Sequence, residues 1–128
     1  MSTYASFGEY LRGLRKAAGL DQRELARRVD ARLLAAGGRG FDVTYLSKIE
    51  NGRVEPPSAE AVRALAEELQ VDPDSLLAYA GKVPPEVGRT LRESAGARLF
   101  YRSIRNTKLT DDEWAALVEE AKRLQEDR

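Results

Sequence analysis

The segment that decides the fold runs from residue 19 to residue 52 and reads GLDQRELARRVDARLLAAGGRGFDVTYLSKIENG. Two stretches in it have apolar residues at helical intervals, and an aspartate precedes each of them, Asp21 before the first and Asp42 before the second. Aspartate is a favoured N-cap because its carboxylate accepts a hydrogen bond from a free backbone N–H of the first turn. Gly52 is suited to end the second helix. The segment therefore predicts two helices joined by an irregular connection.

Helical periodicity continues on both sides of this segment, and no stretch shows the sustained alternation typical of a strand. On the N-terminal side, apolar spacing predicts a helix over residues 6–18. On the C-terminal side, Ser58 and Asp72-Pro73 are suited to begin two further helices before residue 82. The sequence thus predicts an all-α fold, with a five-helix domain over residues 1–81.

The composition of the 128-residue chain closes most routes to catalysis. The chain contains no cysteine and no histidine, which removes disulfides, thiolate chemistry, the usual zinc ligands and the usual general base. Gly37-Gly38-Arg39-Gly40 lacks the lysine of a phosphate-binding loop and follows no strand. No apolar run is long enough to span a bilayer, and residues 1–9 lack the features of a secretory signal. We therefore expect a cytoplasmic protein that is not an enzyme and needs no metal ion or cofactor.

Charge is distributed unevenly along the chain, although the formal net charge is +0. Residues 1–54 carry ten Lys or Arg and six acidic residues, a local charge of +4, and the remainder carries −4. A basic half on a neutral chain indicates a local anion-binding surface. Chance clustering on a solvated helical face is the alternative, and the charge count alone does not separate the two.

The second helix of the central segment has the pattern of a helix that reads DNA. Its Leu46 and Ile49 face inward, which leaves Thr44, Tyr45 and Lys48 outward. A helix that exposes the side chains of its first turns fits the major groove of B-DNA, where all base pairs can be distinguished. We refer to it as the recognition helix.

Short motifs follow one another in a characteristic order between residues 6 and 81. They are Phe7-Gly8-Glu9, Leu11-Arg12, Leu14-Arg15, Gly19-Leu20-Asp21-Gln22, Glu24-Leu25-Ala26, the run from Tyr45 to Gly52, Pro57-Ser58, Leu65-Ala66 and Leu76-Leu77. Each is weak alone, but the ordered set resembles the lambda-repressor-like, or xenobiotic-response-element (XRE), family of helix-turn-helix transcription regulators. The resemblance implies a domain that binds double-stranded DNA as a homodimer on a pseudo-palindromic operator, more commonly as a repressor than as an activator.

The resemblance also implies which side chains meet DNA. The residues expected there are Gln22, Val43, Thr44, Tyr45, Lys48, Asn51 and Arg53. Arg23 is added because it lies with Gln22 in the first turn of its helix, where free N–H groups suit a phosphate. Arg15 and Glu50 match an ion pair with which the family ties the first helix to the recognition helix, so we expect this pair to be structural.

Some of these contacts have structural alternatives. Val43 has no hydrogen-bonding group, so it packs either on a thymine methyl or on the core. Tyr45 either stacks on sugar and phosphate or covers the edge of the core, and Gln22 is alternatively an exposed residue at a helix start. We expect Thr44, Tyr45 and Lys48 to supply most of the sequence readout, and phosphate contacts to supply most of the affinity.

The connection between the two central helices departs from the family pattern. Twelve residues, 30–41, separate Val29 from Asp42, where three or four are usual. They leave room for the preceding helix to extend to about residue 34 or 35, and for a glycine-rich loop that carries Arg39. Arg39 is a candidate contact for the DNA backbone or for the minor groove beside the recognition helix. The alternative is a tolerated surface insertion.

Residues 82–128 are expected to form a separate helical region. Helices are predicted over residues 97–105 and after Thr110, which begins a capping box with Glu113. The last helix carries an apolar stripe that suits a helical pair or a small bundle, so we expect it to mediate dimerisation. The stripe consists of Trp114, Leu117, Val118, Ala121 and Leu124. Packing of this helix onto the chain's own first domain is the alternative.

A row of basic residues on the preceding helix, Arg98, Arg102 and Arg105, has two interpretations. It is either a second contact with DNA or the partner of the acidic residues in the last helix. We favour the pairing, because a row of charges is usually solvated or paired.

Two functions from different classes fit these observations. The first is a dimeric, sequence-specific DNA-binding repressor. The second is an antitoxin or another interaction module, which binds a protein partner and autoregulates its operon. Short regulators of this layout resemble both repressors that a metallopeptidase inactivates and antitoxins that mask a toxin. In either case, the C-terminal helices are the expected docking surface.

Overall fold

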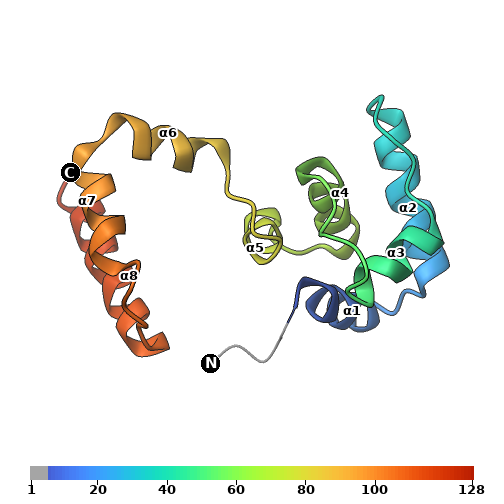
Figure 1. Cartoon of the computed structure of the whole chain (residues 1–128), viewed down its shortest axis with the longest axis horizontal. Coiled ribbons are helices and arrows are strands. Elements are labelled where there is room, and N and C mark those ends of the chain that lie inside the picture. The colour runs from blue at the N-terminus through green and yellow to red at the C-terminus, as the bar shows by residue number, and fades with distance from the viewer. Residues whose placement is uncertain (1–5) are drawn as a thin grey trace. The chain divides into compact units, whose positions relative to one another are not determined.

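The computed structural model describes residues 6–128 and, over that range, consists of eight α-helices without a strand (Figure 1). The helices are α1 (Phe7–Ala17), α2 (Gln22–Ala35), α3 (Val43–Glu50), α4 (Ala59–Leu69), α5 (Pro73–Tyr79), α6 (Pro85–Glu93), α7 (Ala95–Ile104) and α8 (Asp111–Glu126). The all-α prediction is confirmed. The chain divides after residue 85 into a first unit with α1 to α5 and a second unit of residues 86–128. Within residues 6–128, no helix has both the length and the apolar character that crossing a membrane requires.

The predicted caps define both ends of α3 and the start of α2. The Asp21 carboxylate accepts a hydrogen bond from the backbone N–H of Glu24 at 2.8 Å, and the Asp42 carboxylate accepts one from Tyr45 at 2.7 Å. Each bond satisfies a donor that has no partner inside its helix. Gly52 follows α3 with a φ of +72°, in the left-handed region that favours glycine. The sequence-based prediction of these caps is confirmed.

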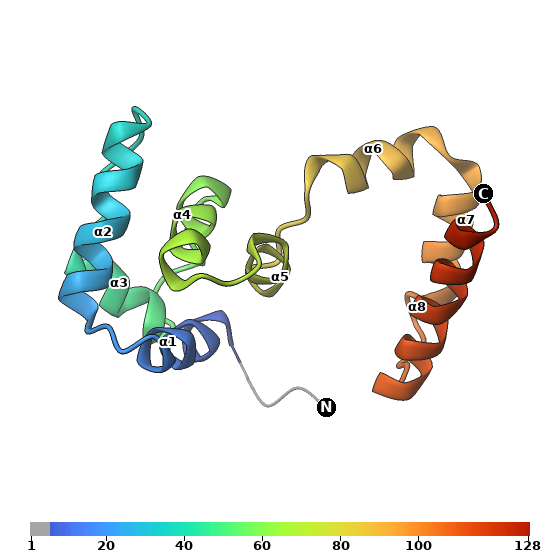
Figure 2. The same ribbon diagram turned by 180° about the vertical axis from the view of Figure 1, so that it is seen from behind.

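The core of the first unit lies where α3 meets α1 and α2, and where α4 meets α2 and α5 (Figure 2). Side chains at the predicted helical intervals fill it. The largest fully buried ones are Leu11, Leu25, Val29, Leu46, Ile49, Val62, Leu65, Leu76 and Leu77. Full burial of one such side chain contributes about 1.5–3 kcal/mol. This core therefore fixes the positions of the short helices, α3 among them.

The long connection from α2 to α3 is folded against the first unit. α2 continues to Ala35, as predicted, and the backbone N–H of Gly38 then donates to the carbonyl oxygen of Leu33 at 2.7 Å. The Asp30 carboxylate accepts a hydrogen bond from the Phe41 N–H at 2.7 Å, and the Phe41 side chain is buried. The connection is thus anchored at both ends, and Phe41 joins the core directly before α3.

Gly8 lies where α1 passes close to the C-terminal end of α3. A Cβ atom at this position would lie 2.7 Å from the carbonyl oxygen of Glu50 and closer still to that of Ile49. Both are backbone atoms, so they can yield only if the helices move apart. We expect Gly8→Ala to lower the free energy of unfolding by about 1–3 kcal/mol, as measured by urea unfolding followed by circular dichroism.

Gly88→Ala is the matched control for this substitution. Gly88 is also helical, but a Cβ there would meet only the end of the Arg92 side chain, at 3.5 Å. We therefore expect no loss, or a small gain, from the better helix propensity of alanine. An equal loss of stability in both variants would show that the close approach at Gly8 is not the cause.

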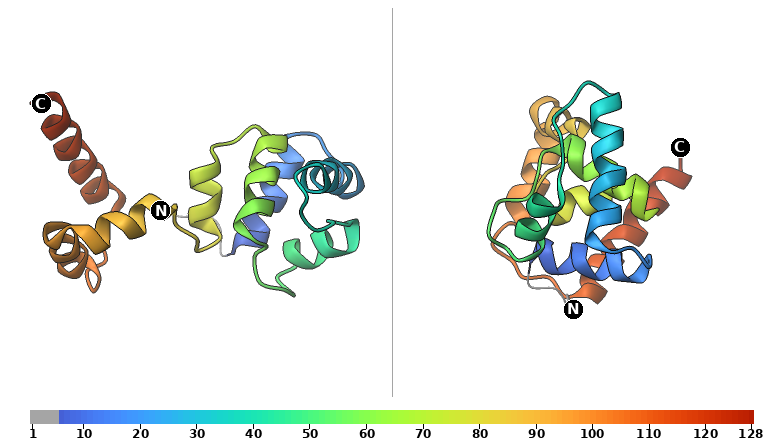
Figure 3. Two further views of the ribbon diagram at one scale, coloured as in Figure 1. Left: turned by 90° about the horizontal axis from the view of Figure 1, so that it is seen from above. Right: turned by 90° about the vertical axis from the view of Figure 1, so that its right-hand side faces the viewer.

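The second unit has no interior of its own. The structure describes all of residues 86–128, and none of them is buried. In the view from above, α8 leads away from α6 and α7 (Figure 3). The predicted capping box is confirmed: the Glu113 N–H donates to Thr110 Oγ1 at 3.1 Å, and the Thr110 N–H donates to the Glu113 carboxylate at 2.8 Å. The helix thus begins as predicted, and its apolar stripe stays largely open to solvent.

The ion pairs expected between α7 and α8 are not formed within one chain, so that prediction is wrong for the single molecule. Arg98 donates instead to the carbonyl oxygens of Leu91 and Arg92, at 2.7 and 2.8 Å. Among residues 6–128, Arg102 and Arg105 have no ion-pair partner. The physical reason is local competition, because several acidic residues of α8 pair with basic residues three or four positions away in the same helix. These pairs are Glu119–Lys122, Glu120–Arg123 and Arg123–Asp127.

Candidate nucleic-acid interface

One side of α3 forms a shallow groove at the protein surface. Its lining residues are Val43, Thr44, Ser47, Lys48, Asn51 and Arg53. Five of these are expected DNA-binding residues, and the structure brings them together on one face. Ser47 was not predicted from the sequence, although its spacing contains the signal. It lies three residues after Thr44 and four before Asn51, and hence on the same side of the helix.

The groove is firmly held because the opposite face of α3 is buried. Leu46 and Ile49 are 0% and 2% exposed, and Asp42 caps the first turn. A helix of eight residues is too short to persist in water alone. Its packing on α1 and α2 therefore supplies its stability and presents the other face in a fixed orientation.

Val43 and Tyr45 lie in less exposed positions than the other candidate residues on α3. Both are partly buried and pack against the core. The Tyr45 ring meets Phe41 edge to face, with 5.3 Å between ring centroids and 70° between ring planes. Tyr45 does not line the α3 groove but a neighbouring pocket. These contacts favour the structural alternative for Tyr45, and Val43 contributes to both the groove and the core edge.

The carboxylate of Glu50 joins α1, α2 and α3 at the end of the groove. Arg15 donates to both of its oxygens, from Nε at 2.7 Å and from Nη2 at 2.9 Å. Gln22 Nε2 donates to the same carboxylate at 3.0 Å, and Arg12 Nε donates at 3.4 Å. The Glu50 side chain is 0% exposed and that of Arg15 is 11% exposed. The ion pair implied by the family resemblance is therefore confirmed, and we call this set, with Asn51, the Glu50 cluster.

Two of the expected DNA-binding residues are hydrogen-bonded within the Glu50 cluster. One is Gln22, whose amide nitrogen is held by the carboxylate. The other is Asn51, whose side-chain oxygen accepts a hydrogen bond from Arg12 Nη2 at 2.5 Å. Sequence reasoning missed Arg12. Its position three residues before Arg15, on the same side of α1, is a signal that points to it.

The buried carboxylate makes the stability of the first unit dependent on pH. Burial by itself raises the pKa of Glu50, but hydrogen bonds from Arg15, Gln22 and Arg12 and the charge of Arg15 hold it below its ordinary value of 4.5. A carboxylate whose pKa is lower in the folded state stabilises the fold above its unfolded pKa, and this contribution disappears as the pH falls through the folded pKa. The stabilisation is thus present at neutral pH and is lost in acid.

We expect the melting temperature of the wild type to fall more steeply than that of Glu50→Gln as the pH falls from about 5 through the folded pKa of Glu50. The two melting temperatures should converge below that folded pKa, because the wild-type side chain is then also uncharged. Circular dichroism melts across this range measure both. Other carboxylates, such as Glu24 with a pKa of about 2, are present in both proteins and cancel in the comparison. Parallel curves would contradict the assignment of this pH dependence to Glu50.

Three arginines of α2 are neutralised by glutamates that lie away from the α3 groove. Arg27 and Arg28 pair with Glu24, at 2.6 and 2.8 Å. Arg32 pairs with two glutamates of α4, Glu67 and Glu68. Within the described residues, the two cations at the α3 groove, Lys48 and Arg53, have no carboxylate partner. These three arginines are therefore less available to an anionic ligand than the charge count suggests, whereas Lys48 and Arg53 remain available at the groove.

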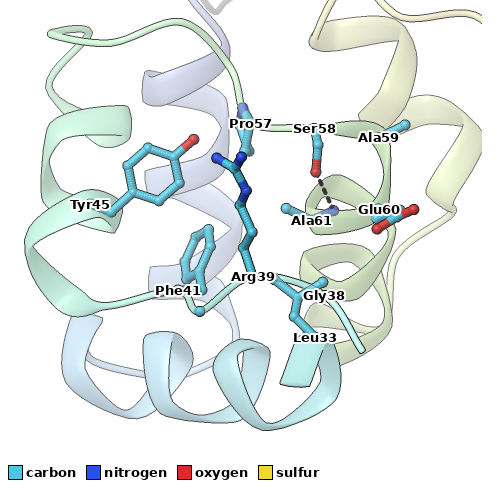
Figure 4. A pocket seen from close by; sticks show the side chains of 11 residues that line it. Leu33, Gly38, Arg39, Phe41, Tyr45, Pro57, Ser58, Ala59, Glu60 and Ala61 are labelled. Atoms are coloured by element: carbon cyan, nitrogen blue, oxygen red, sulfur yellow. Dashed lines mark hydrogen bonds between the residues drawn. The ribbon is translucent and has the colours of Figure 1, made fainter. Parts of the chain in front are cut away.

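Arg39 lies in a separate pocket on the Tyr45 side of α3. The pocket has a volume of about 770 Å³ and is lined by the loop before α3, by Tyr45 and by the start of α4. Figure 4 shows the Arg39 side chain reaching between Tyr45 and Pro57. Arg23 is exposed in the first turn of α2. The structure thus places neither arginine within the groove itself, and Arg39 flanks α3 from the loop.

Comparison with known protein families matches one family model to the chain. The model is described as a helix-turn-helix domain and matches residues 6–78, more than half of the chain. The matched range includes the groove of α3 and the Glu50 cluster. No curated protein matches the chain.

Proposed function

The chain belongs to the helix-turn-helix domain family, and from this premise we propose that it binds specific sequences of double-stranded DNA and regulates transcription. The observation that carries the proposal is the α3 groove. It combines a fixed helix, exposed polar side chains and two unpaired cations, which are the properties needed to enter the major groove and neutralise phosphate. The resemblance of the chain to lambda-repressor-like, XRE-type regulators supports the same function.

The proposed contacts divide into base readout and phosphate binding. Thr44 and Lys48 reach base edges, Ser47 assists them, and Val43 packs on a thymine methyl. Phosphates are bound by residues at the rim of the groove and at the start of α2, with Arg39 reaching the backbone or the minor groove from its loop. These rim residues are Gln22, Arg23, Asn51 and Arg53. Tyr45 supports α3 from the side and touches sugar and phosphate at most.

We further propose that the regulator acts as a homodimeric repressor on a pseudo-palindromic operator. A single helix reads few base pairs, so two copies are needed for useful specificity, and two-fold symmetry of the protein is mirrored in the DNA. The apolar stripe of α8, which is largely exposed in one chain, supports a dimerising role for the second unit. Its residues are Trp114, Leu117, Val118, Ala121 and Leu124.

The experiment that tests the proposed function is selection from a genomic fragment library at two salt concentrations, followed by sequencing of the retained DNA. We expect a pseudo-palindromic motif and an affinity that falls steeply with salt, with a slope of about −0.9 per phosphate contact. The spacing of half-sites then gives the distance between the two α3 helices. Sequence-independent retention, or none, would contradict the proposal. In that case the alternative of an interaction module such as an antitoxin, whose main ligand is a protein, would become the better explanation.

A further inference from the structure

Residues 86–128 do not contain the contacts that a stable helical unit needs. α6 and α7 have nine and ten residues, α8 has sixteen, and none of these helices, which the structure describes in full, has a buried residue. Helices shorter than about 12–15 residues are marginal in water without tertiary support. Domains below roughly 40 residues usually need an additional constraint such as oligomerisation, and this unit is hardly larger. The unit therefore needs contacts from outside itself to supply the missing interior.

The apolar surface that such a partner would cover is extensive on both α7 and α8. Large apolar side chains on these helices are between 43% and 60% exposed. They are Leu99, Phe100 and Tyr101 on α7, and Trp114, Val118 and Leu124 on α8. Exposed apolar patches of this kind mark interaction sites, because monomeric proteins seldom leave them open. Both helices thus expose apolar side chains that contacts from outside the unit could cover.

The charges beside these apolar faces identify the partner. Residues 85–108 carry six Lys or Arg and two acidic residues, a net charge of +4. Residues 111–128 carry seven acidic residues and three Lys or Arg, a net charge of −4. The unit is therefore complementary to itself, and a second copy offers both the basic and the acidic half. Arg102 and Arg105, unpaired within the described residues of one chain, are available to carboxylates of that copy.

We propose that two copies of the chain exchange α8, so that α8 of each copy packs on α6 and α7 of the other. Apolar burial supplies the affinity, and the opposite charges of the two halves determine which helix pairs with which. At 1.5 Å per residue, α8 is about 24 Å long and α7 about 15 Å, so an exchanged α8 is longer than α7 alone can cover. This inference rests on the proposed function in one respect, because it specifies how the proposed homodimer is assembled.

The test uses two charge-reversed variants of the full chain. In the first, the basic half is reversed by Arg102→Glu, Arg105→Glu and Lys108→Glu. In the second, the acidic half is reversed by Glu119→Lys, Glu120→Lys and Glu126→Lys, which leaves the capping box of Thr110 intact. Sedimentation equilibrium measures the dimer dissociation constant of each variant. Native mass spectrometry identifies the species in a 1:1 mixture by mass.

We expect the wild type to be dimeric and each variant alone to dimerise at least 10-fold more weakly. The mixture should form a heterodimer with an affinity within about threefold of the wild type, since every α8 then meets an oppositely charged α6–α7 surface on the other copy. A chain that combines both sets of reversals should dimerise like the wild type, which checks that the substituted helices still fold.

Three results would overturn the exchange. One is a wild type that remains monomeric at tens of micromolar, and another is a first variant that dimerises as well as the wild type, which would place the interface elsewhere. The third is a combined chain that dimerises like the wild type while the 1:1 mixture of the two variants forms no heterodimer. This result would show that α8 packs on its own α7. Fluorescence anisotropy with a single DNA half-site separates these failures from failure of the proposed function. A monomeric variant that still binds the half-site leaves DNA binding intact, whereas a dimer that binds no DNA refutes the function alone.

Discussion

Replacing Arg15 with methionine is expected to lower the free energy of unfolding of the first unit by about 3–5 kcal/mol. The substitution keeps an unbranched side chain of moderate size but removes both hydrogen bonds and the charge that compensate the buried carboxylate of Glu50. An uncompensated carboxylate in that position must either take up a proton or draw in water, and both are costly. Urea unfolding followed by circular dichroism gives the change from the shift of the midpoint.

Arg12→Met is the matched control, because Arg12 touches the same carboxylate from the same helix. Its contact with Glu50 is 3.4 Å long and its side chain is 37% exposed, so we expect a loss of less than about 1 kcal/mol. Combining Arg15→Met with Glu50→Leu should recover much of the lost stability, since no buried charge remains. A loss below about 1 kcal/mol for Arg15→Met would contradict the structural role assigned to the pair.

The joint replacement Thr44→Ala and Lys48→Ala is expected to weaken binding to the selected operator about 100-fold. Both side chains are exposed in the α3 groove, and each specific base contact contributes about 1–3 kcal/mol of discrimination. Binding to unrelated DNA should fall much less, because the other cations at the groove and at the start of α2 remain. Fluorescence anisotropy with the operator and with a scrambled duplex, at one salt concentration, measures both affinities.

Arg63→Ala is the control for this double substitution. Arg63 is an exposed cation of α4 and lies in a depression lined by residues of α2 and α4, without a residue of α3. Its removal should leave the ratio of specific to non-specific affinity unchanged. If the double variant in α3 binds the operator as tightly as the wild type, α3 is not the helix that recognises the base sequence.

The features that the sequence predicted best are those that depend on near neighbours. Asp21, Asp42 and Thr110 cap their helices as predicted. Each needs only a backbone N–H two or three positions further along the chain. Apolar spacing likewise predicted the inward face of α3, because a regular helix fixes which residues share a side.

Contacts between residues that are far apart in the sequence could be predicted only in part. The Arg15–Glu50 pair spans 35 positions, and it was expected only because both residues match a family motif. The bonds from Gln22 and Arg12 to the same carboxylate were not foreseen, since they depend on the packing of three helices. Phe41 also gave no signal, because a single aromatic residue after a glycine-rich loop belongs to no helical period.

The second unit shows a different limit of sequence reasoning. The spacing of Trp114, Leu117, Val118, Ala121 and Leu124 predicts that these side chains share one face. It does not predict what covers that face, since periodicity describes one helix and not its neighbour. Charge raises the same difficulty for Arg102 and Arg105, because complementary residues pair equally well within one chain and between two.

The anchored loop before α3 also makes this protein convenient to label. The bonds of Gly38 to Leu33 and of Phe41 to Asp30 pin the backbone of the loop, while Ala36 is exposed. The natural chain has no cysteine, so a thiol introduced at Ala36 would be the only one to react. A fluorophore attached there lies at the C-terminal end of α2, beside the anchored loop. It can therefore serve as one of the two labels in a distance measurement that follows how α3 approaches its ligand.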